Sequence, residues 1–196
     1  SHKFGVCPAE AEGLYRRAAA SPHIEIRGVA CHIGSQILDV HPFLQAFDEI
    51  RAIADKLRRD EIKVMNLDLG GGLGINYGKS RELDLGALSK RLVSRLRGTP
   101  YQLVLEPGRA LVGDAGLLFA RVLYVKRDPQ KTNKGFIVLD AGMNDLIRPA
   151  LYNSYHKILP VRKGSGEKFL ADVVGPICET GDFLGQEREM QGVKPG

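Results

Sequence analysis

The stretch YQLVLEPGRA, residues 101–110, places two opposite charges directly after a run of apolar residues. Its first five residues read as a buried strand, and Glu106 follows them without a spacer, at a position where it can be partly desolvated. Pro107 and Gly108 then turn the chain, and Gly108 leaves backbone amides uncovered for an anion. Arg109 can bind a carboxylate or phosphate through two hydrogen bonds, so this tip suits a charged small ligand. A purely structural ion pair between Glu106 and Arg109 explains the same residues equally well.

The chain before this stretch alternates between strand and helix signals. Start signals and apolar residues spaced by three and four predict helices at residues 8–21, 42–59 and 85–96. Short apolar runs predict strands at residues 24–32, 64–69 and 101–106. This alternation is typical of parallel βα units, whose functional residues gather at the carboxyl ends of the strands. We expect an α/β domain over residues 1–111, the C-terminal part of a (β/α)8 barrel.

The character of the sequence changes after Arg109. Apolar runs rich in β-branched residues are separated by polar or Gly/Pro segments, and no helix signal of comparable length lies between them; these runs cover residues 116–126, 135–139, 156–162 and 169–174. We therefore expect residues 112–196 to form part of a mostly β C-terminal domain.

The composition excludes several classes of protein. Of the 196 residues, 43% are hydrophobic and 26% charged, which is ordinary for a globular protein. The net charge of +5 is spread along the chain and gives no nucleic-acid footprint. No apolar run approaches the roughly 20 residues of a membrane helix, and no signal peptide is evident, so we expect a soluble, cytoplasmic protein. Three cysteines without metal-ligand spacing predict neither a disulfide framework nor a metal site.

Two groups of residues after the first strands could bind an anion. The run GGGLG at residues 70–74 could present backbone amides to a phosphate, or it could only permit a tight turn. It matches neither a P-loop nor a dinucleotide-binding fingerprint. His32 and Ser35 close the preceding strand, where they could stack on a planar ring and hydrogen-bond a phosphate. A structural histidine is the more common finding at such a position.

Two further groups lie in the β region. Arg148 and Tyr152 are four residues apart, and because Pro149 disfavours a regular helix, they could line one face of a loop. Ordinary packing accounts for them equally well. In the segment GPICETGD, residues 175–182, the thiol of Cys178 is followed by two acids. These neighbours suit a proton donor better than a thiolate nucleophile, which makes Cys178 the candidate catalytic cysteine.

Five segments together resemble the diaminopimelate decarboxylases, pyridoxal-phosphate enzymes of the alanine-racemase and ornithine-decarboxylase group. The segments are HIGSQ (32–36), LDLGGGLG (67–74), EPGR (106–109), DAGMNDLIRPALY (140–152) and CETGD (178–182). The resemblance implies a lyase that converts meso-2,6-diaminopimelate to L-lysine and carbon dioxide in lysine biosynthesis. The alternatives are a related decarboxylase for ornithine, arginine, lysine or carboxynorspermidine, and a non-catalytic homologue that binds a partner.

The resemblance also implies a role for each motif residue at the cofactor, pyridoxal 5′-phosphate. His32 would stack on the pyridine ring, and Glu106 would pair with the ring nitrogen. The phosphate would be held by hydroxyl and backbone groups of Ser35, Gly71, Gly72, Gly108 and Arg109.

On the substrate side, the resemblance implies that Arg109, Arg148 and Tyr152 hold the distal part of diaminopimelate. Glu179 would bind its distal ammonium group. Cys178 would act across a homodimer interface, where it would protonate the carbon that loses carbon dioxide. A substrate with two carboxylates and two ammonium groups requires both Arg and Glu side chains, as this set provides.

The sequence departs from the family at three points. The lysine that carries the cofactor lies upstream of the segment that residues 1–5, SHKFG, resemble, and Lys3 does not match it. The active-site tyrosine of the family's C-terminal segment has no counterpart here, and Glu-Thr-Gly at residues 179–181 replaces the commoner Glu-Ser-Gly. We therefore expect a fragment that carries most of an active site.

Overall fold

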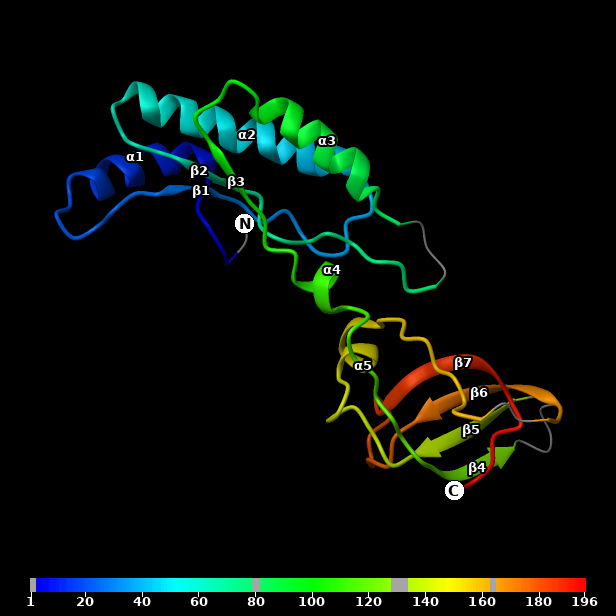
Figure 1. Cartoon of the computed structure of the whole chain (residues 1–196). Coiled ribbons are helices and arrows are strands. Elements are labelled where there is room, and N and C mark those ends of the chain that lie inside the picture. Colours follow the sequence, from blue (N-terminus) through cyan, green and yellow to red (C-terminus); the bar gives the residue numbers. More distant parts are fainter. Residues whose placement is uncertain (1–2, 79–81, 128–133, 163–164) are drawn as a thin grey trace. The chain divides into compact units, whose positions relative to one another are not determined.

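The computed structural model describes residues 3–78, 82–127, 134–162 and 165–196 (Figure 1). Ser1 and His2, which belong to the segment compared with the family above, lie outside the described residues. The chain forms two compact units, Ser1–Gly116 and Leu117–Gly196, each with its own hydrophobic core. The expected domain division after residue 111 stays a prediction, and the first compact unit ends at Gly116.

The first unit consists of three parallel strands with helices between them. In chain order its elements are α1 (Pro8–Ala19), β1 (Gly28–Ala30), α2 (Val40–Arg59), β2 (Asn66–Asp68), α3 (Leu85–Leu96), β3 (Gln102–Val104) and α4 (Gly108–Val112). The strands lie in the order β1-β2-β3, and Val29, Leu67 and Leu103 are aligned across the sheet. The predicted helices and the βα alternation are confirmed, whereas closure into a barrel stays a prediction.

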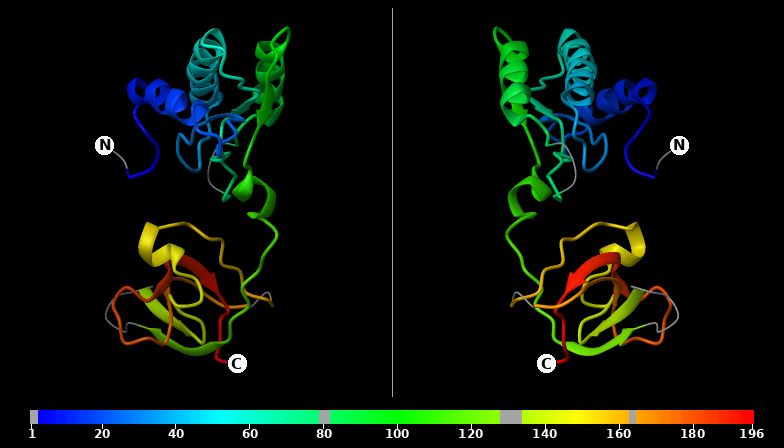
Figure 2. Two further views of the ribbon diagram at one scale, coloured as in Figure 1. Left: turned by 90° about the vertical axis from the view of Figure 1, so that its left-hand side faces the viewer. Right: turned by 90° about the vertical axis from the view of Figure 1, so that its right-hand side faces the viewer.

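Helix α2 has the clearest sequence signals and builds most of the first core. Asp39 caps its start, because its carboxylate accepts a hydrogen bond from the His41 N–H at 2.9 Å. Apolar residues three and four apart then form one buried face, made of Phe43, Phe47, Ile50, Ala54 and Leu57. The helix lies between α1 and α3 and packs on β1 and β2 (Figure 2).

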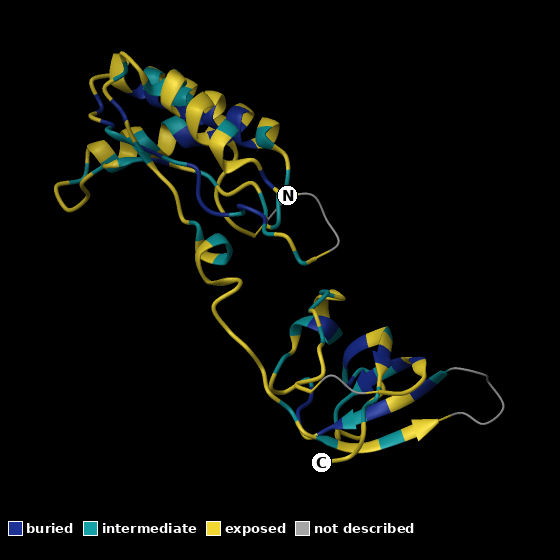
Figure 3. Cartoon of the chain, turned by 45° about the vertical axis from the view of Figure 1, so that its right-hand side comes forward, coloured by how far each residue is buried: buried dark blue, intermediate teal, exposed yellow. Residues whose placement is uncertain are grey.

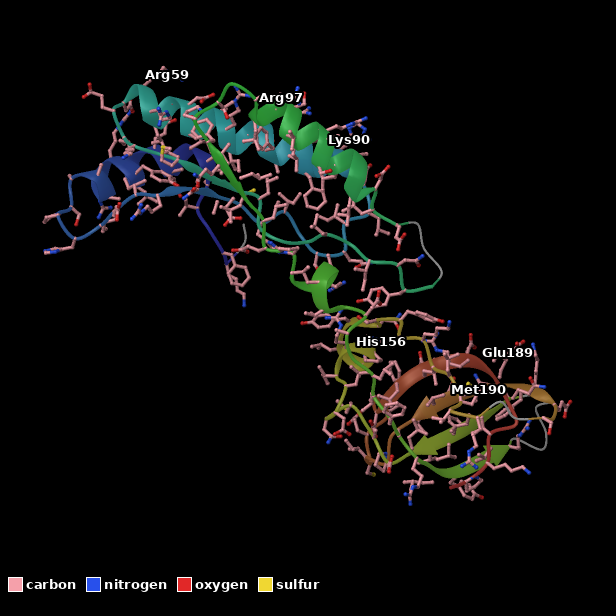
Figure 4. The ribbon with its side chains drawn as sticks, viewed as in Figure 1. Arg59, Lys90, Arg97, His156, Glu189 and Met190 are labelled. Atoms are coloured by element: carbon pink, nitrogen blue, oxygen red, sulfur yellow. The ribbon has the colours of Figure 1, made fainter. Side chains whose placement is uncertain are left out.

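The surface of these helices carries the scattered positive charge expected from the sequence. Arg59, Lys90 and Arg97 are exposed residues at the end of α2, within α3 and just after α3, as labelled in Figure 4. No helix among the described residues is long and apolar enough to cross a membrane.

The strand predicted at residues 101–106 is observed at Gln102–Val104, but the prediction that residues 101–105 are buried is wrong. Tyr101 is buried, but β3 itself is largely exposed, and Leu105 and Glu106 are exposed as well. The cause is the position of β3 at the edge of the described sheet, where one side of the strand has no paired neighbour. Exposure continues beyond α4, since residues 111–119 are all exposed (Figure 3).

The second unit is a four-stranded sheet with one short helix. Its elements are β4 (Val122–Arg127), β5 (Lys134–Leu139), α5 (Arg148–Tyr152), β6 (Lys168–Val174) and β7 (Phe183–Gln191). The strands lie in the order β4-β5-β6-β7, and only the β5–β6 pair is parallel. Alternate residues such as Ile137, Phe169 and Val173 are buried and form the second core. The mostly β character expected here is therefore observed.

Two expectations for the second unit are wrong, and one strand was missed. Residues 156–162 are not a strand, because Pro160 has no N–H to offer a ladder. Residues 148–152 form helix α5 and not a loop, because Pro149 occupies the first helical turn, where a missing N–H costs nothing. The final strand β7 was not predicted, since FLGQEREMQ is mostly polar and contains a glycine.

Candidate cofactor and substrate site

The loops that follow β1, β2 and β3 meet at the carboxyl end of the sheet. The Cys31 N–H donates to the Asp68 carbonyl at 2.9 Å, which continues the β1–β2 pairing past the strand ends. On the other side, the Glu106 N–H donates to the Gly70 carbonyl at 2.8 Å. The backbone therefore places the segments that carry His32, Gly71 and Glu106 beside one another.

The glycines of the second loop allow this close approach. A Cβ atom added to Gly71 would lie 2.5 Å from the Glu106 carbonyl oxygen, and one on Gly70 would lie 2.6 Å from that of Cys31. On Gly72 it would overlap the carbonyl oxygen of Gly34. Gly72 also has φ of 90°, which side chains rarely adopt. The loop therefore needs glycine to pack between its two neighbours, in addition to any role at a phosphate.

Gln36 connects all three loops and holds Arg109. Its side-chain oxygen accepts hydrogen bonds from Arg109 Nη1 at 3.0 Å and from the Ile75 N–H at 3.3 Å. Its amide nitrogen donates to the Ile75 carbonyl at 2.6 Å. Gln36 has φ of 58°, a left-handed conformation that is uncommon for residues other than glycine. Arg109 is therefore oriented by a neutral amide, and among the ion pairs of the described residues none joins it to Glu106.

The polar side chains of the loops after β1 and β3 face solvent. His32, Ser35 and Glu106 are exposed, so the partial desolvation expected for Glu106 is not observed in this chain. Gly108 begins α4, and nothing lies within 4 Å of the position that its Cβ would occupy. A ligand can therefore reach all of these groups from solvent.

In the second unit, α5 brings Arg148 and Tyr152 together. One helical turn separates them, and the guanidinium carbon lies 5.5 Å from the centre of the tyrosine ring, within cation–π range. Arg148 Nη2 also donates to the Ser154 hydroxyl at 3.2 Å. The tyrosine is exposed, so its hydroxyl is accessible to an anionic group, whereas Arg148 is half-buried.

The segment with Cys178 and Glu179 is a tight turn after β6. The Glu179 N–H donates to the Ile177 carbonyl at 2.8 Å, and the Asp182 N–H donates to the Glu179 carbonyl at 3.0 Å. The Glu179 carboxylate accepts the Gly181 N–H at 3.1 Å. Cys178 is a free, exposed cysteine at the tip of this turn.

The buried side chain of Asp182 stabilises this turn. Its side chain is only 3% exposed, and its two carboxylate oxygens accept the N–H groups of Met143 and Ile177 at 2.6 and 2.7 Å. Asp182 and Gln36 are the residues that the sequence analysis missed as parts of the site, although both lie within quoted motifs. In the ranges that the structure describes, no cluster of three or more His, Cys, Asp or Glu side chains could hold a metal ion.

Comparison with known proteins identifies the family. A family model described as "Pyridoxal-dependent decarboxylase, C-terminal sheet domain" matches residues 14–196. The chain belongs to the pyridoxal-dependent decarboxylases. It is 44% identical over 198 residues to diaminopimelate decarboxylase of Aquifex aeolicus, and 47% identical over 189 residues to that of Neisseria meningitidis serogroup A. These alignments cover 99% and 96% of this chain, and 46% of each relative.

A solved structure of the same family agrees. Diaminopimelate decarboxylase from Helicobacter pylori, complexed with L-lysine, superimposes with a TM-score of 0.91 at 35% sequence identity. The match covers 100% of this chain and 48% of that one, so the chain spans about half the length of its relatives. The resemblance to diaminopimelate decarboxylases seen in the sequence is thus confirmed.

Within this pyridoxal-dependent decarboxylase, the candidate residues fall into two sets, one in each compact unit. The first unit carries His32, Ser35, Gly71, Gly72, Glu106, Gly108 and Arg109, and the second carries Arg148, Tyr152, Cys178 and Glu179. The loops of the first set pack together around Gln36. The roles of the individual residues stay predictions.

Proposed function

We propose that the protein containing this chain decarboxylates meso-2,6-diaminopimelate to L-lysine and carbon dioxide, a step of lysine biosynthesis, with pyridoxal 5′-phosphate as cofactor. The observation that carries the proposal is the similarity to diaminopimelate decarboxylases, which extends over 96–99% of the chain. The charged and aromatic groups of both sets support it, because they match the chemistry of this cofactor and substrate.

The first set fits the cofactor. The ring of His32 would stack on the pyridine, and the Glu106 carboxylate would accept a hydrogen bond from the ring nitrogen and keep its proton in place. Donors for the phosphate come from the Ser35 hydroxyl and from backbone or side-chain groups of Gly71, Gly72, Gly108 and Arg109. When bound, pyridoxal phosphate supplies an electron sink that weakens the bond to the departing carboxylate. The exposure of His32, Ser35 and Glu106 leaves these side chains open to that ligand.

The second set fits the distal end of the substrate, together with Arg109. Arg148 and the Tyr152 hydroxyl bind the distal carboxylate, and their cation–π contact already holds them in one orientation. Glu179 accepts hydrogen bonds from the distal ammonium group. An amino acid without both distal groups leaves Arg148 or Glu179 unpaired, and such unpaired groups are what gives an enzyme its selectivity.

Cys178 completes the set as the proton donor. Its thiol gives a proton to the carbon that has lost carbon dioxide, in the active site of the other subunit of a homodimer. The exposed position of Cys178 at the tip of a turn is suited to that role. We place the enzyme in the cytoplasm, as expected from the sequence.

The test is a comparison of substrates. The full gene product containing this chain is purified with pyridoxal phosphate, and kcat/KM is measured for diaminopimelate, ornithine, arginine, lysine and carboxynorspermidine. We expect diaminopimelate to be preferred by about 100-fold or more, because the other substrates leave Arg148 or Glu179 unpaired. Preferred turnover of ornithine would overturn the substrate assignment, and no turnover of any of them would favour a non-catalytic homologue.

A further inference from the structure

The carboxylate of Asp182 joins two segments of the second unit that are far apart in sequence. Its Oδ1 accepts the Met143 N–H at 2.6 Å, and its Oδ2 accepts the Ile177 N–H at 2.7 Å. Among the described residues, Asp182 is the one charged side chain that is buried. A buried carboxylate needs such donors, and each oxygen here has one.

Two glycines make room for this carboxylate. A Cβ atom added to Gly142 would lie 2.8 Å from Oδ1 of Asp182, and one on Gly175 would lie 2.6 Å from the same oxygen. The backbone of Asp182 also pairs with this region, because its carbonyl accepts the Gly175 N–H at 3.0 Å. The structure therefore fits closely around one position of the carboxylate.

Both donors lie in segments that carry or lead to residues that we place at the substrate. Ile177 directly precedes Cys178 in the tight turn. Met143 lies in the segment that leads into α5, and this segment is closed by the hydrogen bond from the Leu146 N–H to the Gly142 carbonyl at 3.1 Å. Helix α5 then begins at Arg148. One side chain therefore joins the turn that carries Cys178 to the segment that leads into α5.

We propose that Asp182 is a positioning residue, which holds the turn with Cys178 and Glu179 in register with Arg148 and Tyr152. The proposal rests on the proposed function, since it gives these four residues their roles. Asp182 itself contacts neither substrate nor cofactor. It acts only through the Met143 and Ile177 amides.

The first test measures amide hydrogen exchange in the full gene product. Asp182→Asn keeps the shape of the side chain but replaces one accepting oxygen with a donor, and Gly142→Ala displaces the carboxylate without removing it. In Gly142→Ala we expect exchange at both Met143 and Ile177 to become about tenfold faster or more, as for the loss of a hydrogen bond to a charged group. In Asp182→Asn we expect the same change at whichever of the two amides faces the new donor, because the remaining oxygen can still accept the other N–H. Exchange at Ile137 and Val173, in the core of the sheet, should change less than about twofold.

A matched control is Asp172→Asn. Asp172 lies in β6 of the same sheet, and its carboxylate accepts the Glu187 N–H at 2.8 Å. This substitution should speed exchange at Glu187 and leave Met143 and Ile177 unchanged. Asp182→Asn could remove protection from hydrogen exchange throughout β4 to β7, which would mean that the second unit unfolds. In that case Gly142→Ala alone tests the proposal. Faster exchange restricted to Met143 and Ile177 supports it, and any other pattern overturns it.

The second test measures decarboxylation by the same variants. We expect Asp182→Asn to lower kcat for diaminopimelate and to raise KM, each by about tenfold, because it disturbs both the proton donor and the binding helix. Asp172→Asn should stay within about twofold of the wild type. An active wild type with an equally active Asp182→Asn variant overturns the positioning role. An inactive wild type contradicts the proposed function instead, and the exchange pattern still decides whether Asp182 holds the two segments.

Discussion

At the scale of single residues, Cys178 has the most specific predicted role. It is exposed at the tip of a turn that the backbone and Asp182 hold in place. We predict that Cys178→Ala lowers kcat for diaminopimelate by about 100-fold or more, which is typical for the loss of a proton donor. The affinity for pyridoxal phosphate, measured by absorbance titration, should be unchanged.

Cys7 offers the matched control for this experiment. It is also a free, exposed cysteine, at the start of α1, and it has no predicted role. Cys7→Ala should therefore retain full turnover. Wild-type turnover by Cys178→Ala would show that another group donates the proton.

Gln36 is predicted to act through Arg109. Its side chain accepts a hydrogen bond from the guanidinium at 3.0 Å and also holds the loop after β2. Gln36→Ala should raise KM for diaminopimelate by about tenfold, since hydrogen bonds to charged groups contribute about 1.5–3 kcal/mol. Steady-state kinetics check this, with Gln45→Ala as the control, because the Gln45 side chain donates to Glu49 on the exposed surface of α2. An unchanged KM would mean that Arg109 is positioned without Gln36.

The sequence could identify motif residues but not the residues that support them. Glu106, Arg109 and Cys178 stand out because charged or reactive groups follow apolar runs directly. Gln36 binds residues 39 and 73 positions away, and Asp182 joins nearby Ile177 to Met143, which is 39 positions away. Their roles depend on backbone conformations that the sequence does not reveal. The one sequence signal for Asp182 was an aspartate directly after Gly181 and before the apolar pair Phe183 and Leu184.

At the scale of elements, helix signals were more reliable than strand signals. The periodic apolar faces of α2 and α3 and their Asp39 and Asp84 caps are local, so residues 42–59 and 85–96 could be assigned from the sequence. Strand β7 carries mostly polar residues because it lies at the edge of its sheet, and its identity depends on pairing with β6. Pairing partners distant in sequence decide such strands.

Tyr101 joins the start of β3 to α2 and gives a stability prediction. Its hydroxyl donates to the Asp55 carboxylate at 2.5 Å. Burial, followed by this hydrogen bond and the charge of Asp55, raises the pKa of Tyr101 from 10.0 to about 12. The neutral hydroxyl therefore stabilises the fold fully below pH 10, and this contribution is lost as the pH rises toward 12.

We predict that Tyr101→Phe lowers the free energy of unfolding by about 1.5 kcal/mol at pH 8, as expected for a lost hydrogen bond to a charged group. The variant should also lose less stability than the wild type between pH 10 and pH 11.5, because it no longer has the titrating group. Denaturant titrations at pH 8, 10 and 11.5 check this. Tyr124→Phe is the control, since Tyr124 is 59% exposed on β4. Identical pH profiles would contradict the role of this hydroxyl.

At the scale of the whole molecule, the two compact units carry different groups of the proposed active-site residues. The first carries the groups predicted to hold the cofactor, and the second carries the proton donor and most of the groups predicted to bind the substrate. The alternation of strand and helix signals predicted parallel βα units correctly. The three strands of this chain do not determine whether a closed barrel forms. The outer edges of β1 and β3 are unpaired within the described sheet, which favours further pairing with other strands.

The central claim is that these residues belong to a diaminopimelate decarboxylase. Carbon dioxide release from meso-diaminopimelate by the full gene product, saturated with pyridoxal phosphate, tests it most directly when the wild type is compared with Glu106→Gln. We predict one lysine for each carbon dioxide in the wild type, and turnover about 100-fold slower or more in Glu106→Gln, because the variant no longer holds the proton on the ring nitrogen. No release by the wild type, or equal rates for both proteins, would contradict the account.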